Sequence, residues 1–468
     1  MSDNFGTAGY FSLEEFVIID LANPSKIRDI KNHVYRFNIK ESMESGYMTG
    51  SVEIHDAVDI LSGFPLKGEE LLIIRWKDFY LNEHTDVFCV YSITDVTDSK
   101  NYNDTLMTYK LHYTSANKYF TDFYSIQRGF RNSTIAEIVD IMFTSYYNNP
   151  EFYSGIDRRE ILNETNLPDF NPFKPISTIT PTKGIQSLVI PSLSPDQTME
   201  FLTRRAVTDS FEDQTQMFRF FETKFSYLFT THDELNYGFV DAIPNVPSEL
   251  RYFYSPTLNY AESTQNLDQL RIMQKILDFE YPQDVHTIRD SNSGSYIRRA
   301  GQIDILNRSY LPEDYNHLSF TNEYQYPDGY REARPVHGPN FIDKYFKNRA
   351  EILMIKDYPG VGESGGDYLR PPTYYAESYN KKIANFYHHN LHKTKMRVYG
   401  RIDLIPGTVI QVDLPEIKYE GTGERVHRRE DDEVRGKNFL VETVDNVFYE
   451  DRYYALLEVS KSGLGREI

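Results

Sequence analysis

Three glycines have the spacing of a nucleotide-binding loop. Gly360, Gly362 and Gly365 spell G-x-G-x-x-G after an apolar run that could form a strand. In dinucleotide-binding folds such glycines bring the pyrophosphate to the N-terminus of the next helix. Here Pro371 and Pro372 follow within a few residues, and proline interrupts the helix that the motif requires. The pattern therefore favours a flexible surface loop over a dinucleotide site.

A second segment resembles the start of a calcium-binding loop. Asp290, Asn292 and Gly294 match its first positions. The twelfth position is Gly301, where the loop needs a glutamate that binds the ion through both oxygens. The sequence thus argues against calcium binding of this type.

A histidine cluster is the remaining candidate for a metal site. His388, His389 and His392 include a pair at i and i+4. The first histidine has no glutamate beside it, and no clear acidic third ligand is near. A solvated or interfacial cluster is favoured over a metal site.

Familiar catalytic motifs are missing from the sequence. It has no G-x-S-x-G, no G-x-x-x-x-G-K-[ST] and no Cys-x-x-Cys. The single cysteine, Cys89, lies on an alternating strand, where a buried apolar thiol is favoured over a catalytic one. With 69 aspartates and glutamates, pairing two of them as an acid/base site would be arbitrary. We find no positive evidence for catalysis and expect no cofactor.

The composition indicates a soluble protein with large interfaces. The 468 residues are 40% hydrophobic and 25% charged, with 37 tyrosines and 30 phenylalanines, which suit surfaces that pack and also form hydrogen bonds. The net charge of −19 argues against a surface that grips nucleic acid, since each phosphate contact needs a lysine or an arginine. A surface past which nucleic acid slides stays compatible with this charge, although a merely soluble acidic protein is the simpler explanation.

The sequence has no targeting or membrane-spanning pattern. The opening MSDNFGTAGYF has no basic stretch followed by an apolar core, and no segment approaches the roughly 18 uninterrupted apolar residues of a membrane span. We therefore expect a soluble protein made in a cytoplasm.

A strand pattern near the start of the chain is repeated at its end. Gly68 and Gly407 each open a strand whose apolar positions have the same offsets: Leu71 and Ile73 in the first copy, Ile410 and Val412 in the second. In the first copy a pair of strands follows, with the apolar residues Phe88, Val90, Ile93 and Val96. In the second copy one strand follows, with the apolar residues Phe439, Val441, Val444 and Val447. Return strands close both copies, over 105–113 and 452–460. This repetition predicts a duplicated β domain.

Between the two copies the pattern changes to helices. Thr134 and Glu137 form a capping box before a helical stripe, and Ser194 caps a second helix that runs to about Val207. The other predicted elements are a strand over 47–55, an extended connection over 163–194, a hairpin over 217–221 and 225–229, and helices over 266–279 and 376–386. The segment 281–370 is rich in loops.

A run of mixed charge lies between the last strands. The segment ERVHRREDDEVRGK begins at Glu424 and ends at Lys437. Mixed charge between strands is usually a solvated tip, and the alternative is a loop that contacts a neighbouring subunit. The candidate contact residues are Glu424, Arg428, Arg429, Asp431 and Arg435.

Three stretches of the chain resemble a known family. GYMTGSVEIHDAVDILSGFPLKGEELLIIRW is similar to the N-terminal tube domain of the baseplate central hub proteins of contractile-tailed bacteriophages. GRIDLIPGTVIQVDLP and GKNFLVETVDNVFYEDRYYALLEVSKSG resemble the second tube domain of these hubs. The capped helices and the hairpin FRFFETKFSYLF occupy the places of the outer domains, whereas 281–370 has no counterpart.

The resemblance implies a fold that is α+β and mainly β. It has two similar antiparallel β-barrel-like tube domains plus outer mixed domains. We expect a first tube domain over 1–120, an outer α+β domain over 121–235, a loop-rich mixed region over 236–390, and the C-terminal part of the second tube domain over 391–468.

The resemblance also implies a structural role in a virion tail. Three hub chains form a homotrimeric ring, so that six similar β units surround the DNA channel and adapt a sixfold tail tube to a threefold spike. The implied partners are the tail tube protein and the central spike protein, with tape measure and peripheral baseplate proteins as further candidates. The DNA passes without specific binding.

Strand alternation suits a barrel wall that is packed outside and wet inside, and an acidic wall would repel passing phosphates. We expect Glu53, Asp413 and Glu442 on the channel side or its rims. Two alternatives stay open: a cell-wall hydrolase at the tail tip, and the hub of a phage-derived injection or secretion machine.

Overall fold

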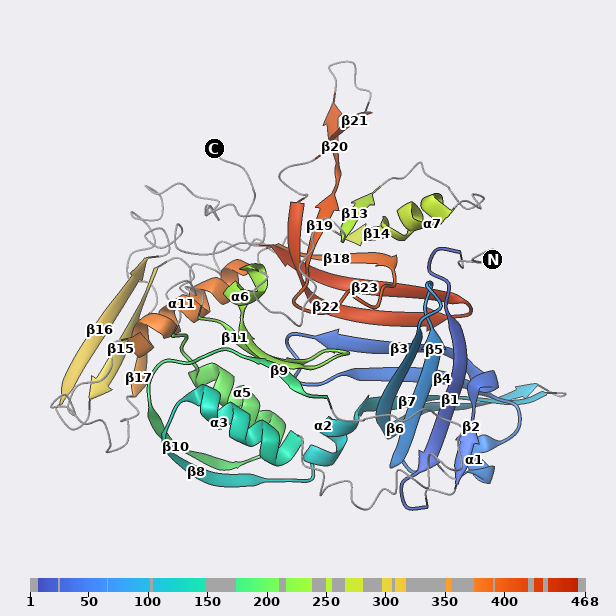
Figure 1. Ribbon diagram of the computed structural model, residues 1–468, viewed down its shortest axis with the longest axis horizontal. Coiled ribbons are helices and arrows are strands. Elements are labelled where there is room, and N and C mark those ends of the chain that lie inside the picture. Colours follow the sequence, from blue (N-terminus) through green and yellow to red (C-terminus); the bar gives the residue numbers. More distant parts are fainter. Residues whose placement is uncertain are drawn as a thin grey trace.

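In a computed structural model, the chain forms a mainly β fold in which two barrels lie beside an outer part built of helices and strands (Figure 1). The structure describes residues 7–23, 26–64, 66–101, 104–147, 174–209, 216–237, 250–254, 266–280, 297–304, 308–316, 351–355, 374–389, 392–419, 425–431 and 437–461. A 13-stranded sheet runs through both barrels. The mainly β class predicted from the sequence is confirmed.

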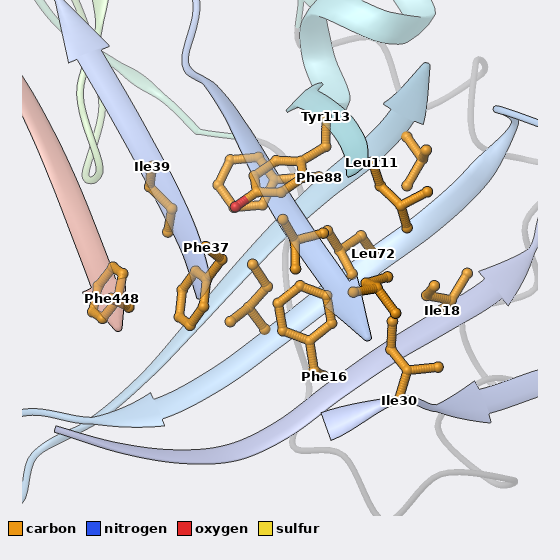
Figure 2. Close-up of a cluster of buried hydrophobic side chains, with 14 of the residues drawn as sticks. Phe16, Ile18, Ile30, Phe37, Ile39, Leu72, Phe88, Leu111, Tyr113 and Phe448 are labelled. Atoms are coloured by element: carbon orange, nitrogen blue, oxygen red, sulfur yellow. The ribbon is translucent and has the colours of Figure 1, made fainter. Parts of the chain in front are cut away.

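Six strands near the N-terminus form the first barrel. They are β1 (Ser12–Asp20), β3 (Val34–Ser42), β4 (Thr49–Asp56), β5 (Glu70–Lys77), β6 (Glu83–Asn101) and β7 (Asp104–Ser115). Their order is β1-β5-β6-β7-β4-β3 and all neighbours are antiparallel. Short β2 (Ile27–Asp29), the 3-10 turn η1 (Lys31–His33) and helix α1 (Ile60–Gly63) complete this part. All six strands contribute to one apolar core (Figure 2).

The second barrel also has six strands. They are β13 (Arg251–Tyr254), β14 (Lys275–Glu280), β18 (His392–Tyr399), β19 (Val409–Asp413), β22 (Lys437–Tyr449) and β23 (Arg452–Lys461). The order β19-β13-β14-β18-β23-β22 is closed by a further pairing of β22 with β19. Thus β13 and β14, from the region 236–390, join the strands of 391–468 in one barrel.

The two barrels are duplicates in strand order. Strands β3, β4, β5, β6 and β7 of the first barrel correspond, in this order, to β14, β18, β19, β22 and β23 of the second barrel. The ladder between the last two strands shifts register at the same place in each copy, between Val90 and Ser92 and between Val441 and Thr443. Each copy also has a glycine with positive φ before its β5 or β19 strand, Gly68 at 84° and Gly407 at 90°, a conformation that favours glycine. The predicted duplication is therefore confirmed.

Two details of the predicted repeat are wrong. Leu72 and Ile74 point into the first core, whereas Leu71 and Ile73 pack in a separate cluster under helix α2 (Ala116–Thr121). The first copy has one more residue than the second between its glycine and the first side chain that points into the core. Because side chains alternate along a strand, this shift places every later side chain of the strand on the opposite face. The predicted pair of strands after Gly68 is the single strand β6. The two barrels also differ in one pairing, because β13 is parallel to β19, whereas β1 is antiparallel to β5.

Neither barrel is wet inside, contrary to the expected wall that is packed outside and wet inside. Apolar side chains from all six strands fill each interior. Six strands enclose too narrow a space for a channel, since even eight leave only enough room for side chains. Any channel must therefore lie outside the individual barrels.

The outer part packs two helices against strands. It contains β8 (Ile126–Ser133), α3 (Ile135–Met142), the π-turn η2 (Phe143–Tyr147), β9 (Ile176–Ile179), β10 (Gln186–Leu193), α5 (Pro195–Arg205), β11 (Phe218–Glu222), β12 (Tyr227–Thr231) and α6 (His232–Tyr237). Both predicted capping boxes, at Thr134 and at Ser194, are present, and the predicted hairpin is β11–β12. The expected extended connection contains strands β9 and β10, because their edges find partners in β12 and β8.

The remaining described elements lie outside the first barrel and the outer part. Helix α7 (Asn266–Met273) ends where β14 begins, so the predicted helix over 266–279 is wrong in its second half. Strands β15 (Ile297–Asp304), β16 (Ser309–Asn316) and β17 (Glu351–Ile355) form a separate sheet next to α11 (Tyr374–His389), which confirms the predicted last helix. Strands β20 (Pro415–Tyr419) and β21 (Arg425–Asp431) form a hairpin that projects from the second barrel (Figure 1).

We expect Gly50→Ala to destabilise the first barrel. A Cβ at this position in β4 would lie 2.2 Å from the Asn38 carbonyl oxygen and 2.3 Å from the Tyr113 ring, and overpacking of this kind costs about 1–3 kcal/mol. Gly63→Ala is the matched control, because its Cβ meets no atom within 4 Å. Chemical unfolding of both variants checks this, and equal stability of the two would contradict it.

Candidate functional site

One strand joins the two barrels. The first half of β22 pairs with β19 of its own barrel, from Leu440 to Lys437. Farther along the strand, Thr443 to Tyr449 pair with Ser42 to Arg36 of β3, in the first barrel. The barrels therefore share a continuous ladder that runs β14-β18-β23-β22-β3-β4-β7-β6, and they present one common outer face.

This shared outer face carries polar and charged side chains. Along each strand they alternate with the core residues; for example, Glu53 is half-buried between the buried Val52 and Ile54. The register aligns the outward residues of neighbouring strands in rows. Its charged members include Arg36, Lys40, Glu53, Lys110, Asp278, Glu280, Lys395, Arg397, Asp445 and Glu458. We call this set the shared polar face.

Charges on the shared polar face are compensated between strands. Arg36 Nε lies 2.8 Å from Glu53 Oε2, and Lys395 Nζ lies 3.2 Å from Glu458 Oε1. Lys40 faces Asp445 in the register of β3 and β22. Basic and acidic side chains interleave on the face. The surface therefore has little net charge of either sign.

Two titratable groups of this face have perturbed pKa values. Partial burial raises the pKa of the Asp445 carboxyl, and its hydrogen bond from Asn38 Nδ2, 2.7 Å long, and the nearby Lys40 oppose this effect. Partial burial lowers the pKa of the His112 imidazole, and the nearby Lys110 lowers it further. Because the ordinary pKa of histidine is already near 6.5, His112 is neutral at physiological pH.

The structure separates the three residues predicted for the channel side. Glu53 lies on the shared polar face. Asp413 pairs with Arg251 at the contact of β19 with β13. Glu442 is buried and lies 2.7 Å from Lys393 Nζ. A channel-side position for these residues stays a prediction.

The charged run between the last strands forms part of a hairpin instead of a loop. Arg428, Arg429 and Asp431 lie on β21, which pairs with β20. Glu424 and Arg435 lie outside the described residues. The loop prediction failed because a run of mixed charge carries no local signal for its pairing with β20. Its predicted contact with another subunit is untested.

The other candidate motifs form no site in the described part of the chain. The Gly360 pattern and the Asp290 segment lie outside it, apart from Gly301 in β15. His388 and His389 end α11 and His392 begins β18, and the positions of their side chains are not described. The described residues contain no group of three or more side chains suited to a metal ion.

Cys89 is buried as predicted, and burial raises the pKa of its thiol. No described helix is long and apolar enough to cross a membrane.

A lysine from the outer part is inserted where the two barrels meet. Lys224, at the turn of the β11–β12 hairpin, lies 3.3 Å from Asp86 Oδ2 and 4.5 Å from the centroid of the Trp76 ring. Its backbone N–H donates to Glu41 Oε2 at 2.8 Å. Glu41 and Asp86 belong to the first barrel. The hairpin is thus anchored beside the strand that joins the barrels.

The second barrel completes this buried cluster. Asn446 of β22 donates to Glu41 Oε1 at 3.3 Å and accepts from the Tyr453 hydroxyl at 2.8 Å. We call Glu41, Trp76, Asp86, Lys224, Asn446 and Tyr453 the junction cluster. Sequence reasoning missed it, because a lysine in a hairpin turn normally lies in solvent. Its only signal is the turn Glu222-Thr223-Lys224 between two aromatic strands.

Burial dominates the electrostatics of the junction cluster. It raises the pKa of the Glu41 carboxyl to about 7, and nearby Lys174 and Lys224 only partly offset this. It also lowers the pKa of the Lys224 ammonium. Each buried charge loses solvation, which its partner must compensate. The cluster is suited to fixing relative positions, and we assign it no chemistry.

No protein family model matches the sequence, and no curated protein matches it. One similar solved structure is the 43 kDa tail protein of prophage MuSo2 from Shewanella oneidensis. The two sequences are 10% identical, the match covers 95% of this chain and 98% of that chain, and the TM-score is 0.49. A second similar structure is a tail protein from Neisseria meningitidis MC58. It is 9% identical in sequence, the match covers 97% of this chain and 98% of that chain, and the TM-score is 0.49.

A third similar structure is an Escherichia coli component of the type VI secretion system, described as structurally similar to tail proteins of bacteriophage T4. It has 8% identity, 93% and 76% coverage, and a TM-score of 0.40. All three TM-scores are below 0.5, so the function of this chain must be argued from its own residues and contacts.

We expect Glu41 to make the protein less stable as the pH rises. The pKa of the Glu41 carboxyl in the folded protein, about 7, lies above its ordinary value of 4.5. Its contribution to the free energy of unfolding is therefore complete below about pH 4.5 and is lost as the pH rises through 7. Between pH 5.5 and pH 8 the loss is about 2 kcal/mol.

The measurement is urea unfolding at both pH values. Glu41→Gln should remove this part of the pH dependence. Glu53→Gln, which removes one charge from a half-exposed ion pair, controls for net charge. The same pH dependence in the wild type and in Glu41→Gln would show that the carboxyl does not titrate in this range.

Proposed function

We propose that this chain is a structural subunit of a phage-type tail, a baseplate hub that assembles as a homotrimeric ring around a channel. The observation that carries the proposal is the duplication of one six-stranded barrel in the same strand order, with β22 joining the copies. Three such chains supply six similar barrels, and a ring of six barrels built from three chains matches a sixfold tube on one side and a threefold spike on the other.

The shared polar face is our candidate for the channel wall. It is continuous across both barrels of one chain, and its charges are compensated by neighbours. Because it has little net charge, it neither attracts nor strongly repels a polyanion, so DNA would slide past it. The face therefore suits passage better than binding.

The expected location is the tail baseplate of a virion, and the expected partners are a tail tube protein and a central spike protein. The β20–β21 hairpin projects from the second barrel (Figure 1). A projecting hairpin is suited to reach a neighbouring protein. We propose it as a contact element for a second protein in the baseplate.

The first test is the solution mass of the purified chain by light scattering, alone and with a candidate spike. We expect a mass three times that of one chain in at least one condition, because the channel exists only when copies surround it. A single-chain mass in both conditions would contradict the hub.

A second test addresses the shared polar face. In the trimer, a cysteine at Lys40 or Lys395 should react with a small maleimide but at least about tenfold more slowly with a bulky polyethylene glycol maleimide, because a channel excludes large reagents. Val189→Cys on β10 is the control, since Val189 is 66% exposed. Equal rates of the bulky reagent at all three positions would place the face outside the channel.

A further inference from the structure

We propose that a cavity in the junction cluster binds one water molecule, through which the carboxyl groups of Glu41 and Asp86 share a single proton. The cavity lies where the two barrels meet the β11–β12 hairpin of the outer part. Because this site lies within one chain, it does not depend on whether three chains form a ring.

The cavity has the size and the lining that a single water molecule needs. Its volume is about 10 Å³, and its polar lining consists of Glu41, Asp86, Lys224, Asn446 and Tyr453. A space of about 10–15 Å³ for a water-sized sphere holds one molecule, provided that two to four polar groups can bond to it. These polar side chains come from the first barrel, the outer part and the second barrel. A water molecule bound there would therefore bridge all three.

The cluster has one more carboxyl than its ammonium groups can match. Glu41 and Asp86 are 1% and 7% exposed. Lys224 Nζ lies 3.3 Å from Asp86 Oδ2, and the other nearby lysine, Lys174, lies 2.7 Å from Glu222 Oε1. Within the described part of the chain, an ionised Glu41 would thus be a buried charge without an ion pair of its own, which is costly. A proton on Glu41 removes this cost.

The proton on Glu41 needs an acceptor, but the protein groups that contact this carboxyl are donors. The backbone N–H of Lys224 donates to Oε2 at 2.8 Å, and Asn446 Nδ2 donates to Oε1 at 3.3 Å. The amide oxygen of Asn446 already accepts from the Tyr453 hydroxyl at 2.8 Å. A protonated carboxyl is itself a donor. A water molecule in the cavity supplies the acceptor that these groups do not.

Asp86 can accept the other end of this hydrogen-bond chain. The Trp76 indole Nε1, at 2.9 Å, and Lys224 Nζ, at 3.3 Å, both donate to its Oδ2. Among the described residues, none donates to its Oδ1. A water molecule that accepts from Glu41 can donate to this oxygen. The two carboxyls then carry one proton and one negative charge between them, and Lys224 balances that charge.

A monovalent metal ion is the other way to balance two buried carboxylates. The ammonium group of Lys224 lines the cavity, and it would repel a cation placed beside it. Water carries no charge and can both accept and donate. The lining therefore favours water over an ion.

One further titratable group lies close enough to affect a measurement. The ring of His84 lies 4.7 Å from the ring of Trp76, and its Nε2 lies 3.0 Å from Asp78 Oδ2. Histidine commonly changes its charge near neutral pH. Any optical signal from Trp76 must therefore be separated from the titration of His84.

The test uses Trp76, the single tryptophan of the chain, as a reporter inside the cluster. Its fluorescence should change with pH in a step whose midpoint is near pH 7, because burial raises the pKa of the Glu41 carboxyl to about 7. The step should be lost in Glu41→Gln and kept in His84→Gln. In Asp86→Asn the midpoint should fall by about one pH unit or more, because Lys224 then pairs with Glu41.

Glu53→Gln on the shared polar face is the control for net charge and should leave the midpoint unchanged. A step that persists in Glu41→Gln would overturn the shared proton. A midpoint that falls when sodium chloride replaces choline chloride at equal ionic strength would assign the cavity to a metal ion and overturn the water.

A crystal structure of the unaltered chain at acidic pH tests the water directly. We expect one water molecule at about 2.6–3.2 Å from both Glu41 and Asp86. Direct contact between the two carboxyls would overturn the bridging water. None of these results depends on the solution mass, so failure here leaves the hub untouched, and a single-chain mass leaves this site untouched.

Discussion

The structure depends on a single strand that serves two barrels. Because β22 is long enough to pair first with β19 and then with β3, its inward side chains fill two cores in turn. Phe439, Val441 and Val444 lie in the second core. Phe448 lies in the first, where it stacks on Phe37 with the ring centroids 4.4 Å apart. Neither barrel can therefore move on its own without disturbing packing in the other.

The outer part is tied to the same place. Lys224 enters between the barrels at the end of a hairpin whose strands belong to the outer core. Buried charges contribute little net stability, because desolvation offsets their attraction, but the loss of one partner is costly. The junction cluster therefore selects one arrangement of three parts and adds little to the stability of any one of them. The hairpin therefore fixes the position of the outer part relative to the barrels.

Much of the fold could be predicted from the sequence because its signals are local. Alternation in β4 and β22, the capping boxes at Thr134 and Ser194, and the shared spacing of Phe88 and Phe439 all reflect neighbours within a few residues. The errors arise where distant partners decide. Asn266 to Phe279 fits a helical stripe, yet β18 captures its second half as β14. The junction cluster joins residues hundreds of positions apart, such as Glu41 and Asn446, and no local pattern marks them.

The two barrels differ in how they close, and this affects their mechanics. The second is a complete cylinder, whereas no ladder between β1 and β3 closes the first in the described part of the chain. A cylinder resists shear all around its wall, while an open seam lets the wall flex. In a ring of such chains, stiff and compliant segments would alternate. A sixfold partner placed on that ring would meet a surface whose shape repeats six times. The stiffness of that surface would repeat only three times.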